Sequence, residues 1–382
     1  MTKSGPISKS ELKHFEPIEP SEAMPLKMRN LLRPALRFRV PAADERERSA
    51  QSVSACLETR HMERDQLISI SLEAEAAGAE LHWPGRRAVT AARRSREAHA
   101  HTIDDHRPPW FGVNFRGPDT APRQPEPRLF IRGKRVSPVQ LFNDQRHILT
   151  ATGWPHHCVG IITNSDGKQG SGTLVGPNLV LTASHVCPWD SIHSGRGWWM
   201  TFAPHATVGS TPFGQTNAAD ILSYRQVGES ADSFEIAEDY AVLHLYDRLG
   251  DALGWMGGET YSEDWNDQNI WEFIGYPGDY GGNPAVETFQ SIEDGDSPGV
   301  FGTGAGLDLE TEASIVKGAS GGPAWAWFQE GDRAHARIVG VVSAENVAPA
   351  DLGSAIAGDS ENFLGGGSEM IDLVNQARSR WP

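Results

Sequence analysis

Three short segments of the chain contain a histidine, an aspartate and a serine flanked by glycines. They read TASH at 182–185, DYAVL at 239–243 and GASGGP at 318–323. A serine hydroxyl is too weak an acid to attack an acyl carbon unaided, so it needs an imidazole to take its proton and a carboxylate to orient that imidazole. His185, Asp239 and Ser320 are therefore candidates for the base, the orienting carboxylate and the nucleophile of an acyl-transfer reaction.

Short β-strands are expected to position these side chains. From about Leu141, apolar runs alternate with Gly, Pro, Asn and Asp, which is typical of a multi-stranded all-β domain. Gly176-Pro177-Asn178 predicts a hairpin connection just before the histidine segment. The clearest predicted strands are Cys158–Thr163, Gly172–Val175, Leu179–Thr182, Ala241–Leu245, Trp271–Gly275, Ala324–Phe328 and Ile338–Ser343.

Each segment also has a plainer explanation. The aspartate segment could be an exposed carboxylate that precedes a strand, and the serine segment could be a glycine-rich turn with a chance serine. Asp220 and Asp232 compete with Asp239, but neither leads directly into an apolar strand. The three segments together therefore carry more weight than any one of them.

The run GSGTLVGPNLVLTASH at 170–185 resembles the histidine segment of trypsin-like and chymotrypsin-like serine peptidases. The order His, Asp, Ser, with separations of 54 and 81 residues, is similar to that family. The resemblance covers about residues 141–382. It implies an all-β, chymotrypsin-like double β-barrel and a serine endopeptidase that forms an acyl-enzyme. Ser184 stands where alanine is more usual, a change expected to have little effect.

By the same resemblance, the N–H groups of Gly318 and Ser320 form the oxyanion hole, where losing one donor typically costs about 3 to 4 kcal/mol. Ala319 stands where digestive members carry an aspartate that pairs with a newly cut N-terminal amine. That ion pair cannot form here. The pocket must therefore be ordered by other contacts or by the N-terminal part of the chain.

The motif GYPGD at 275–279 resembles a loop of a microbial branch that includes glutamyl endopeptidases. In that branch a histidine often stands beside the specificity pocket, but the matching residue here is Val342, so glutamate specificity is not expected. Ser314 is expected at the base of the pocket, with no fixed negative charge there. The edge that pairs with an extended substrate is expected at Ser343, Ala344 and Glu345. A weak side-chain preference, or one for medium-sized side chains, is expected.

The charge distribution separates two regions. Of the net charge of −16, residues 1–140 carry +6 and residues 141–382 carry −22. A basic leader beside an acidic body suggests different physical roles, although an acidic surface can also serve solubility alone. Phosphates would be repelled by the body, and no apolar run is long enough to span a bilayer. We expect a soluble monomer with polypeptide substrates and no nucleic-acid or membrane partner.

The leader, residues 1–135, precedes a predicted peptidase domain at 136–382. Residues 1–43 are expected to be mostly irregular, 44–81 helical, and the proline-rich stretch 107–127 a linker. Arg132-Gly133-Lys134-Arg135 before Val136 resembles a dibasic processing site, so a cut there would leave the leader as an intramolecular inhibitor or folding aid. The alternative is an exposed strand or linker.

Several further expectations complete the sequence reading. Ser368–Arg380 predicts a closing helix with a serine N-cap. Cys158 and Cys187 allow either a disulfide or two buried thiols. No metal-ligand or phosphate-binding motif is visible, so no cofactor is expected, while a calcium site in the acidic body stays open. No standard secretory signal is visible, although the family resemblance favours secretion.

Two other function classes stay open. The first is a catalytically silent relative whose groove binds extended peptides. The second is an interaction protein that uses the basic stretch Arg86–Arg96 of the leader on acidic partners or nucleic acid. The filled His, Asp and Ser positions argue against the silent relative, and a phosphonate probe separates it from an enzyme.

Overall fold

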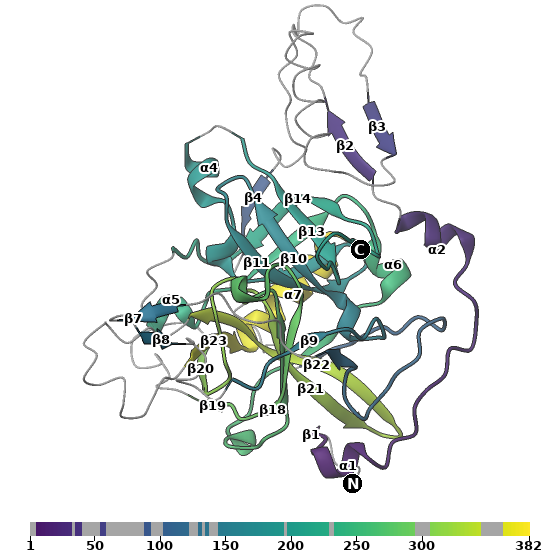
Figure 1. Cartoon of the computed structure of the whole chain (residues 1–382). Helices are drawn as coiled ribbons and strands as arrows, with labels where there is room; N and C mark the ends of the chain where they lie inside the picture. Colours follow the sequence, from purple (N-terminus) through teal and green to yellow (C-terminus); the bar gives the residue numbers. More distant parts are fainter. Residues whose placement is uncertain are drawn as a thin grey trace, which may run out of the picture.

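The computed structural model describes residues 5–32, 35–39, 54–58, 88–92, 102–121, 129–131, 134–136, 144–194, 197–228, 233–294, 306–344 and 362–382. These residues form two large β-sheets, with short helices and turns at their margins (Figure 1). The short helices are α1 (Lys9–Leu12), α2 (Leu26–Leu31), α4 (Trp189–His193), α5 (Ser233–Ile236) and α6 (Leu249–Leu253). Three-ten turns lie at His156–Cys158, Ser184–Val186, Glu263–Trp265 and Gly278–Tyr280.

The first sheet closes into a barrel. Its strands pair in the order β13-β10-β11-β12-β15-β14, and β14 pairs again with β13. Its strands bury large apolar side chains, including Leu174, Met200 and Phe202. The strands are β10 (Val159–Asn164), β11 (Gln169–Gly176), β12 (Leu179–Thr182), β13 (Met200–Pro204), β14 (Thr216–Ser223) and β15 (Ala241–Leu245).

The second sheet repeats the same pairing scheme. In chain order, its first strand pairs with the second and fourth, the fifth with the fourth and sixth, and the sixth with the third, as in the first barrel. Among the described residues, the second and third strands do not pair to close it. These six strands are β17 (Trp271–Gly275), β18 (Ala285–Gln290), β20 (Gly306–Thr311), β21 (Pro323–Glu330), β22 (Arg333–Ala344) and β23 (Asn362–Gly367).

Shorter strands extend the second sheet at its margins. One comes before the first barrel in the sequence, and two come after it. They are β9 (His147–Leu149), β16 (Gly257–Glu259) and β19 (Glu293–Asp294). The prediction of an all-β, chymotrypsin-like fold with a C-terminal helix is confirmed. The duplication is visible only in the pairing scheme, because no internal repeat is evident in the sequence.

The predicted strands agree closely with the structure. Leu179–Thr182, Ala241–Leu245 and Trp271–Gly275 have the predicted bounds, and the other four predicted strands overlap β10, β11, β21 and β22. Gly176 pairs with Leu179 across the predicted hairpin. Agreement is best where a strand is buried on both sides, since such strands read as short continuous apolar runs.

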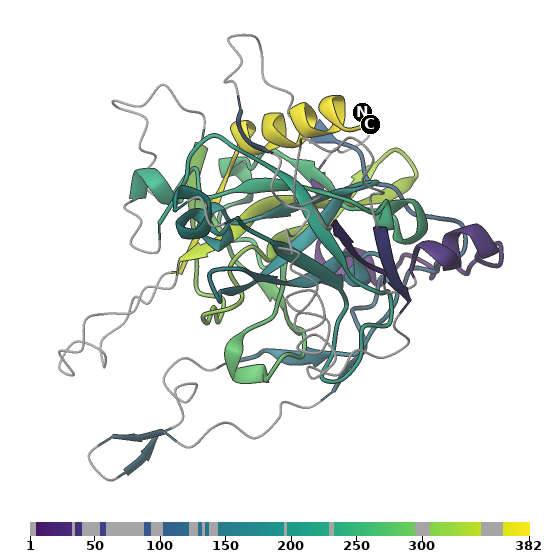
Figure 2. The same cartoon turned by 90° about the horizontal axis from the view of Figure 1, so that it is seen from above.

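The C-terminal helix α7 spans Ser368–Arg380 and lies across the molecule (Figure 2). Its predicted apolar face is buried, with Ile371, Val374 and Ala377 each 0% exposed, and it packs against β15 and β23. The predicted serine cap is wrong. Gly367, with φ of 90°, is the N-cap and makes no side-chain bond, so Ser368 is already the first helical residue.

The described parts of the leader join both sheets. Strand β1 (Gly5–Pro6) pairs with β21, β5 (Thr102–Ile103) with β16, and β6 (Thr120–Ala121) with β9. Strand β4 (Ala88–Ala91) lies parallel to β14 of the first barrel. Leader residues also enter the main core cluster, namely Ile7, Leu12, Ile103, Val113 and Phe115. The leader is therefore built into the fold at several places.

One expectation for the leader needs correction. Residues 1–43 were expected to be mostly irregular, and the helices described there, α1 and α2, are short, with a capping box at Ser8 and Glu11 at the start of α1. The helix expected over 44–81 is the one at fault. Within 44–81, the described residues Ser54–Glu58 form a strand, β3, paired with β2 (Ala35–Arg39). The helix predicted from local composition does not form at β3, because pairing with β2 determines the backbone conformation there.

The predicted processing site lies in a small hairpin. Strand β8 (Lys134–Val136) pairs only with β7 (Leu129–Ile131) among the described residues, with Arg135 opposite Phe130. Whether the chain is cut between Arg135 and Val136, and whether the domain boundary falls there, stay predictions. No helix in the described ranges is long and apolar enough to cross a membrane.

Replacing Phe115 by alanine should lower the free energy of unfolding by about 3 to 5 kcal/mol, because a large buried ring is lost. Phe115 is 4% exposed and contacts the rings of Phe15 and Trp327 at centroid distances of 5.3 and 4.8 Å. The matched control in the same leader is Leu26→Ala, at a side chain 68% exposed, which should change stability by less than about 0.5 kcal/mol. Denaturant unfolding of the full chain measures both free energies. Equally small losses of stability in the two variants would contradict the conclusion that the leader is part of the core.

Candidate active site

His185 lies in a tight turn at the end of a barrel strand. Strand β12 ends at Thr182, and the three-ten turn Ser184–Val186 follows directly. The imidazole is 17% exposed, so it is partly shielded yet reachable. Lys168 also holds this turn, since its Nζ donates to the carbonyl of His185 at 3.2 Å.

Asp239 contacts His185 twice. One carboxylate oxygen accepts from the backbone N–H of His185 at 2.9 Å, and the other lies 2.6 Å from Nδ1 of its ring. The carboxylate has no exposed surface and also accepts from the hydroxyl of Ser343 at 2.6 Å. Because an ionised carboxylate can only accept, Nδ1 carries the proton and Nε2 of the neutral ring is the basic nitrogen.

The competing aspartates do not reach this histidine. Asp220 is occupied elsewhere on β14, where its carboxylate lies 3.0 Å from Nδ1 of His244. Asp232 lies outside the described residues. The structure therefore joins Asp239, and not Asp220, to His185.

Ser184 is not the neutral replacement that we expected from the sequence. Its side chain is buried, and its hydroxyl donates to the carbonyl of Arg225 at 2.7 Å while accepting from the N–H of Val227 at 3.2 Å. An alanine could make neither bond. The hydroxyl thus fixes the loop that follows β14 against the histidine turn.

Ser320 lies in the loop Val316–Gly322, here called the serine loop, which approaches the histidine turn through the backbone. The carbonyl of Ser320 accepts from the N–H of Ser171 at 2.7 Å. A Cβ placed on Gly170 would lie 2.7 Å from the Val186 side chain and 3.0 Å from that carbonyl oxygen. The Ser320 backbone and the residue after His185 therefore flank the same glycine. The described residues offer no hydrogen-bond partner to the Ser320 hydroxyl.

The serine loop begins with a turn that requires glycine. The N–H of Ala319 donates to the carbonyl of Val316 at 2.9 Å, Gly318 has φ of 102°, and Lys317 keeps a negative φ. This is a type II turn, in which the third residue must have positive φ. Gly321, with φ of 87°, is equally constrained, because a Cβ there would lie 2.1 Å from the carbonyl oxygen of Ser171.

The N–H groups of the serine loop divide into two sets. Those of Ala319, Gly321 and Gly322 donate to backbone carbonyls at 2.8 to 2.9 Å. Those of Val316, Lys317, Gly318 and Ser320 have no acceptor in the part of the chain that the structure describes. Backbone N–H groups in folded proteins are nearly always paired. The two that flank Ala319, those of Gly318 and Ser320, can therefore receive a negatively charged oxygen beside the candidate nucleophile.

A buried carboxyl group that the sequence did not indicate lies beside Ser314. Glu287 on β18 is 4% exposed and accepts from the N–H of Ser314 at 2.8 Å. That no fixed negative charge lies at the base of a specificity pocket stays a prediction. Burial raises the pKa of Glu287 to about 7, and the nearby Asp144 raises it further, against the lowering by the Ser314 N–H and Arg146. No sequence signal links these residues, which lie 27 positions apart in the chain.

The predicted substrate edge is only partly described. Ser343 lies at an irregularity between β22 and β23, where Val342 pairs with Leu364 and Ala344 pairs with Phe363. Ser343 itself is therefore left out of the β23 ladder at the bulge. Glu345 lies outside the described residues.

The two cysteines of the acidic body are both free and buried, so the disulfide alternative does not form here. Burial raises the pKa of both thiols well above the usual range, which leaves them protonated and unreactive at neutral pH. The sulfur of Cys158 instead lies 3.6 Å from the carbonyl oxygen of Gly254. Free thiols were the second alternative that the sequence left open.

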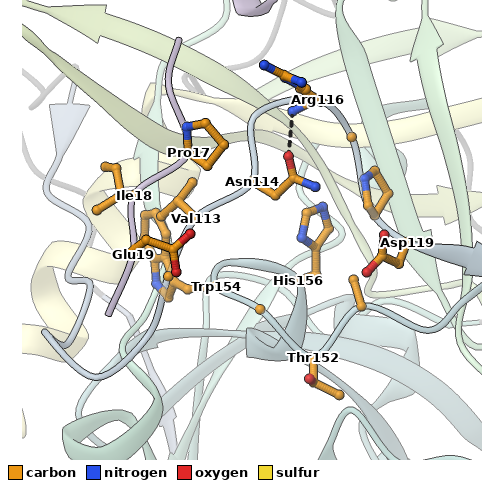
Figure 3. Close-up of a pocket in the computed structure, with 15 residues that line it drawn as sticks. Pro17, Ile18, Glu19, Val113, Asn114, Arg116, Asp119, Thr152, Trp154 and His156 are labelled. Carbon is orange, nitrogen blue, oxygen red and sulfur yellow. Dashed lines mark hydrogen bonds between the residues drawn. The ribbon is translucent and has the colours of Figure 1, made fainter. Parts of the chain in front are cut away.

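A cavity of about 560 Å³ lies away from these residues, and none of the candidate catalytic residues lines it. Figure 3 shows Pro17, Ile18 and Glu19 of the leader on one side and Trp154 and His156 below. Asn114 faces into the same space, with its side-chain oxygen accepting from the N–H of Arg116 at 3.0 Å. Within the described ranges, no cluster of three or more His, Cys, Asp or Glu could hold a metal ion.

Neither a protein-family model nor a curated protein matches the chain. Among solved structures, a Glu endopeptidase in complex with MPD is 18% identical at a TM-score of 0.45, with 62% of this chain and 97% of that chain covered. The protease Anisep from Arthrobacter nicotinovorans is 18% identical at a TM-score of 0.42, with 59% and 97% covered. Both similarities are at low identity, and the strand pairing described above carries the fold assignment.

The buried Glu287 predicts a pH-dependent stability. Its pKa is about 7 in the folded chain and about 4.3 when unfolded, so the folded state holds the proton more tightly and loses this advantage as pH rises. Relative to Glu287→Gln, wild-type unfolding free energy should fall by about 2 to 3 kcal/mol between about pH 4.5 and pH 7.5. Denaturant unfolding across this range measures the difference. Glu312→Gln, at an exposed position nearby, should show no such trend, and a flat difference for Glu287→Gln would refute the assignment.

Proposed function

We propose that the chain is a serine endopeptidase that hydrolyses peptide bonds with Ser320 as nucleophile, His185 as general base and Asp239 as the orienting carboxylate. The observation that carries the proposal is the 2.6 Å contact between the buried Asp239 carboxylate and Nδ1 of His185. Because this contact keeps the proton on Nδ1, the unprotonated Nε2 can act as the base. The acceptor-free N–H groups of Gly318 and Ser320 support the same chemistry.

In the proposed reaction, Nε2 of His185 takes the proton of the Ser320 hydroxyl as Oγ attacks the carbonyl carbon of the substrate. The N–H groups of Gly318 and Ser320 stabilise the negative oxygen of the tetrahedral intermediate. The imidazolium, stabilised by Asp239, then returns the proton to the leaving amine and leaves an acyl-enzyme. Water, activated by the same imidazole, releases the acid and restores the Ser320 hydroxyl.

The substrates in this proposal are polypeptides in an extended conformation. Strand β22 ends beside Asp239, and the bulge at Ser343 leaves its backbone outside the β23 ladder. A substrate strand could pair there by β-augmentation. Ser314 and Glu287 would then lie at the base of the side-chain pocket, which makes this pocket polar at its floor.

A second candidate is a silent peptide-binding module with the same groove. One observation favours it, namely that no hydrogen bond to the Ser320 hydroxyl occurs among the described residues. Hydrogen bonds of a free catalytic site are often long and tighten only in the substrate complex. The distinction between the two candidates is therefore chemical and can be made with a covalent probe.

A peptidyl phosphonate should label the native chain stoichiometrically at Ser320, because an activated serine oxygen displaces the leaving group from phosphorus. Ser320→Ala should take up no label, and peptide mapping by mass spectrometry identifies the modified residue. Labelling elsewhere, or none on folded protein, would favour the silent module.

Asp239→Asn should reduce kcat about 10³- to 10⁴-fold, because an amide no longer holds the histidine in the required tautomer. Asp220→Asn is the matched control, since it breaks the other aspartate–histidine pair, at 3.0 Å from His244, and should leave kcat unchanged. Steady-state hydrolysis of a peptide substrate measures both variants. Equal losses in the two would remove Asp239 from the mechanism.

A further inference from the structure

We propose that Ser171 is the positioning residue that holds the serine loop in the conformation needed for an oxyanion hole. The inference rests on the proposed function and adds to it a residue outside the three catalytic ones. Ser171 lies on β11 of the first barrel, whereas the serine loop belongs to the second half of the fold. Its side chain has no exposed surface.

The hydroxyl of Ser171 connects two segments of the second half. It donates to the carbonyl of Gly318 at 2.8 Å and accepts from the N–H of Tyr276 at 2.9 Å. A serine hydroxyl has a single proton to donate, and here that proton is committed to the serine loop. The hydroxyl thus ties the loop to the end of β17.

The backbone of Ser171 holds the same loop a second time. Its N–H donates to the carbonyl of Ser320 at 2.7 Å, and its own carbonyl accepts from the hydroxyl of Thr182 at 2.7 Å. One residue therefore fixes the carbonyls of Gly318 and Ser320, the two residues whose N–H groups are the proposed oxyanion donors. Thr182 in turn ends the strand that leads to His185.

The carbonyls of Gly318 and Ser320 share their peptides with the N–H groups of Ala319 and Gly321. Ser171 therefore ties the peptide that follows each proposed oxyanion donor. In a trans peptide the C=O and N–H point in opposite directions. The carbonyl of Lys317 accepts from the N–H of Gly278 at 2.8 Å, so the N–H of Gly318 in that same peptide points away from Gly278. With the Gly318 carbonyl held by Ser171, the peptides on both sides of Gly318 are tied, and neither can rotate alone.

Besides Ser171, the backbone N–H groups of Gly278 and Val342 hold the serine loop, donating to the carbonyls of Lys317 and Gly322 at 2.8 and 2.9 Å. Ala319, which precedes the nucleophile, carries only a methyl group, so its side chain forms no hydrogen bond or ion pair with neighbouring elements. Glycines at 318, 321 and 322 give the loop more conformational freedom than other residues would. Its ordering must therefore come from neighbouring donors, and Ser171 supplies two of them.

The test replaces Ser171 by alanine in the full chain. We expect kcat per phosphonate-titrated active site to fall about 10- to 100-fold, less than the loss of an oxyanion donor itself, because both N–H groups remain but are less well aligned. KM should stay within about twofold, since ground-state binding is unchanged. The affinity of a peptide boronic acid, which forms a tetrahedral adduct, should fall by the same factor as kcat/KM.

The matched control is Thr173→Val, two residues along the same strand. The Thr173 hydroxyl is also buried, but it has no partner, so its removal should leave kcat, KM and boronic-acid affinity unchanged. Ser171→Cys keeps a weak donor and acceptor and should give a kcat between those of wild type and Ser171→Ala. If the alanine variant does not fold, the comparison of kcat between wild type and Ser171→Cys still tests the positioning role of Ser171. Unchanged kcat in a folded Ser171 variant, or a loss confined to KM, would overturn the proposal.

A second measurement does not depend on activity. In a Ser320→Ala background, which removes the nucleophile, adding Ser171→Ala should increase deuterium uptake of the peptide that contains Val316–Gly322, while adding Thr173→Val should not. Equal uptake would overturn the positioning role. If the proposed peptidase function is wrong, the phosphonate will not label the wild-type chain, and this result is distinct from the result on Ser171.

Discussion

The structure depends on a carboxylate that water cannot reach. Removing an ionised group from water costs several kcal/mol unless partners replace the solvent, and Asp239, at 0% exposure, has three such partners. They are the backbone N–H and ring of His185 and the hydroxyl of Ser343. The first belongs to the barrel and the last to the second sheet. The charge of Asp239 therefore holds the two halves of the fold in register where the site lies.

Local sequence patterns predicted the parts of the fold that local physics decides. Strands such as Leu179–Thr182 are short apolar runs between turn residues, and the glycines at 318 and 321 occupy backbone conformations that other residues rarely adopt. The His185 to Asp239 contact was foreseen only because three motifs were read together. Such features need no knowledge of the rest of the chain.

The missed features are contacts between distant segments. Glu287 reaches Ser314 across 27 residues, and Ser171 reaches Gly318 across 147 residues, so neither contact has a local signature. Ser184 was misjudged for the same reason, since its hydroxyl bonds to a loop 41 residues away. Side-chain hydroxyls and buried carboxylates find their partners only after the strands are in place.

The way the leader is incorporated bears on what a backbone break would do. Its described strands pair with β21, β16, β9 and β14, and its apolar side chains sit in the shared core. A single nick in the β7–β8 hairpin would therefore yield a two-chain protein whose fragments co-purify and separate only on denaturation. The leader would then stay bound to the body although the chain is cut. A smaller band on a denaturing gel would therefore not show that the native protein has lost the leader.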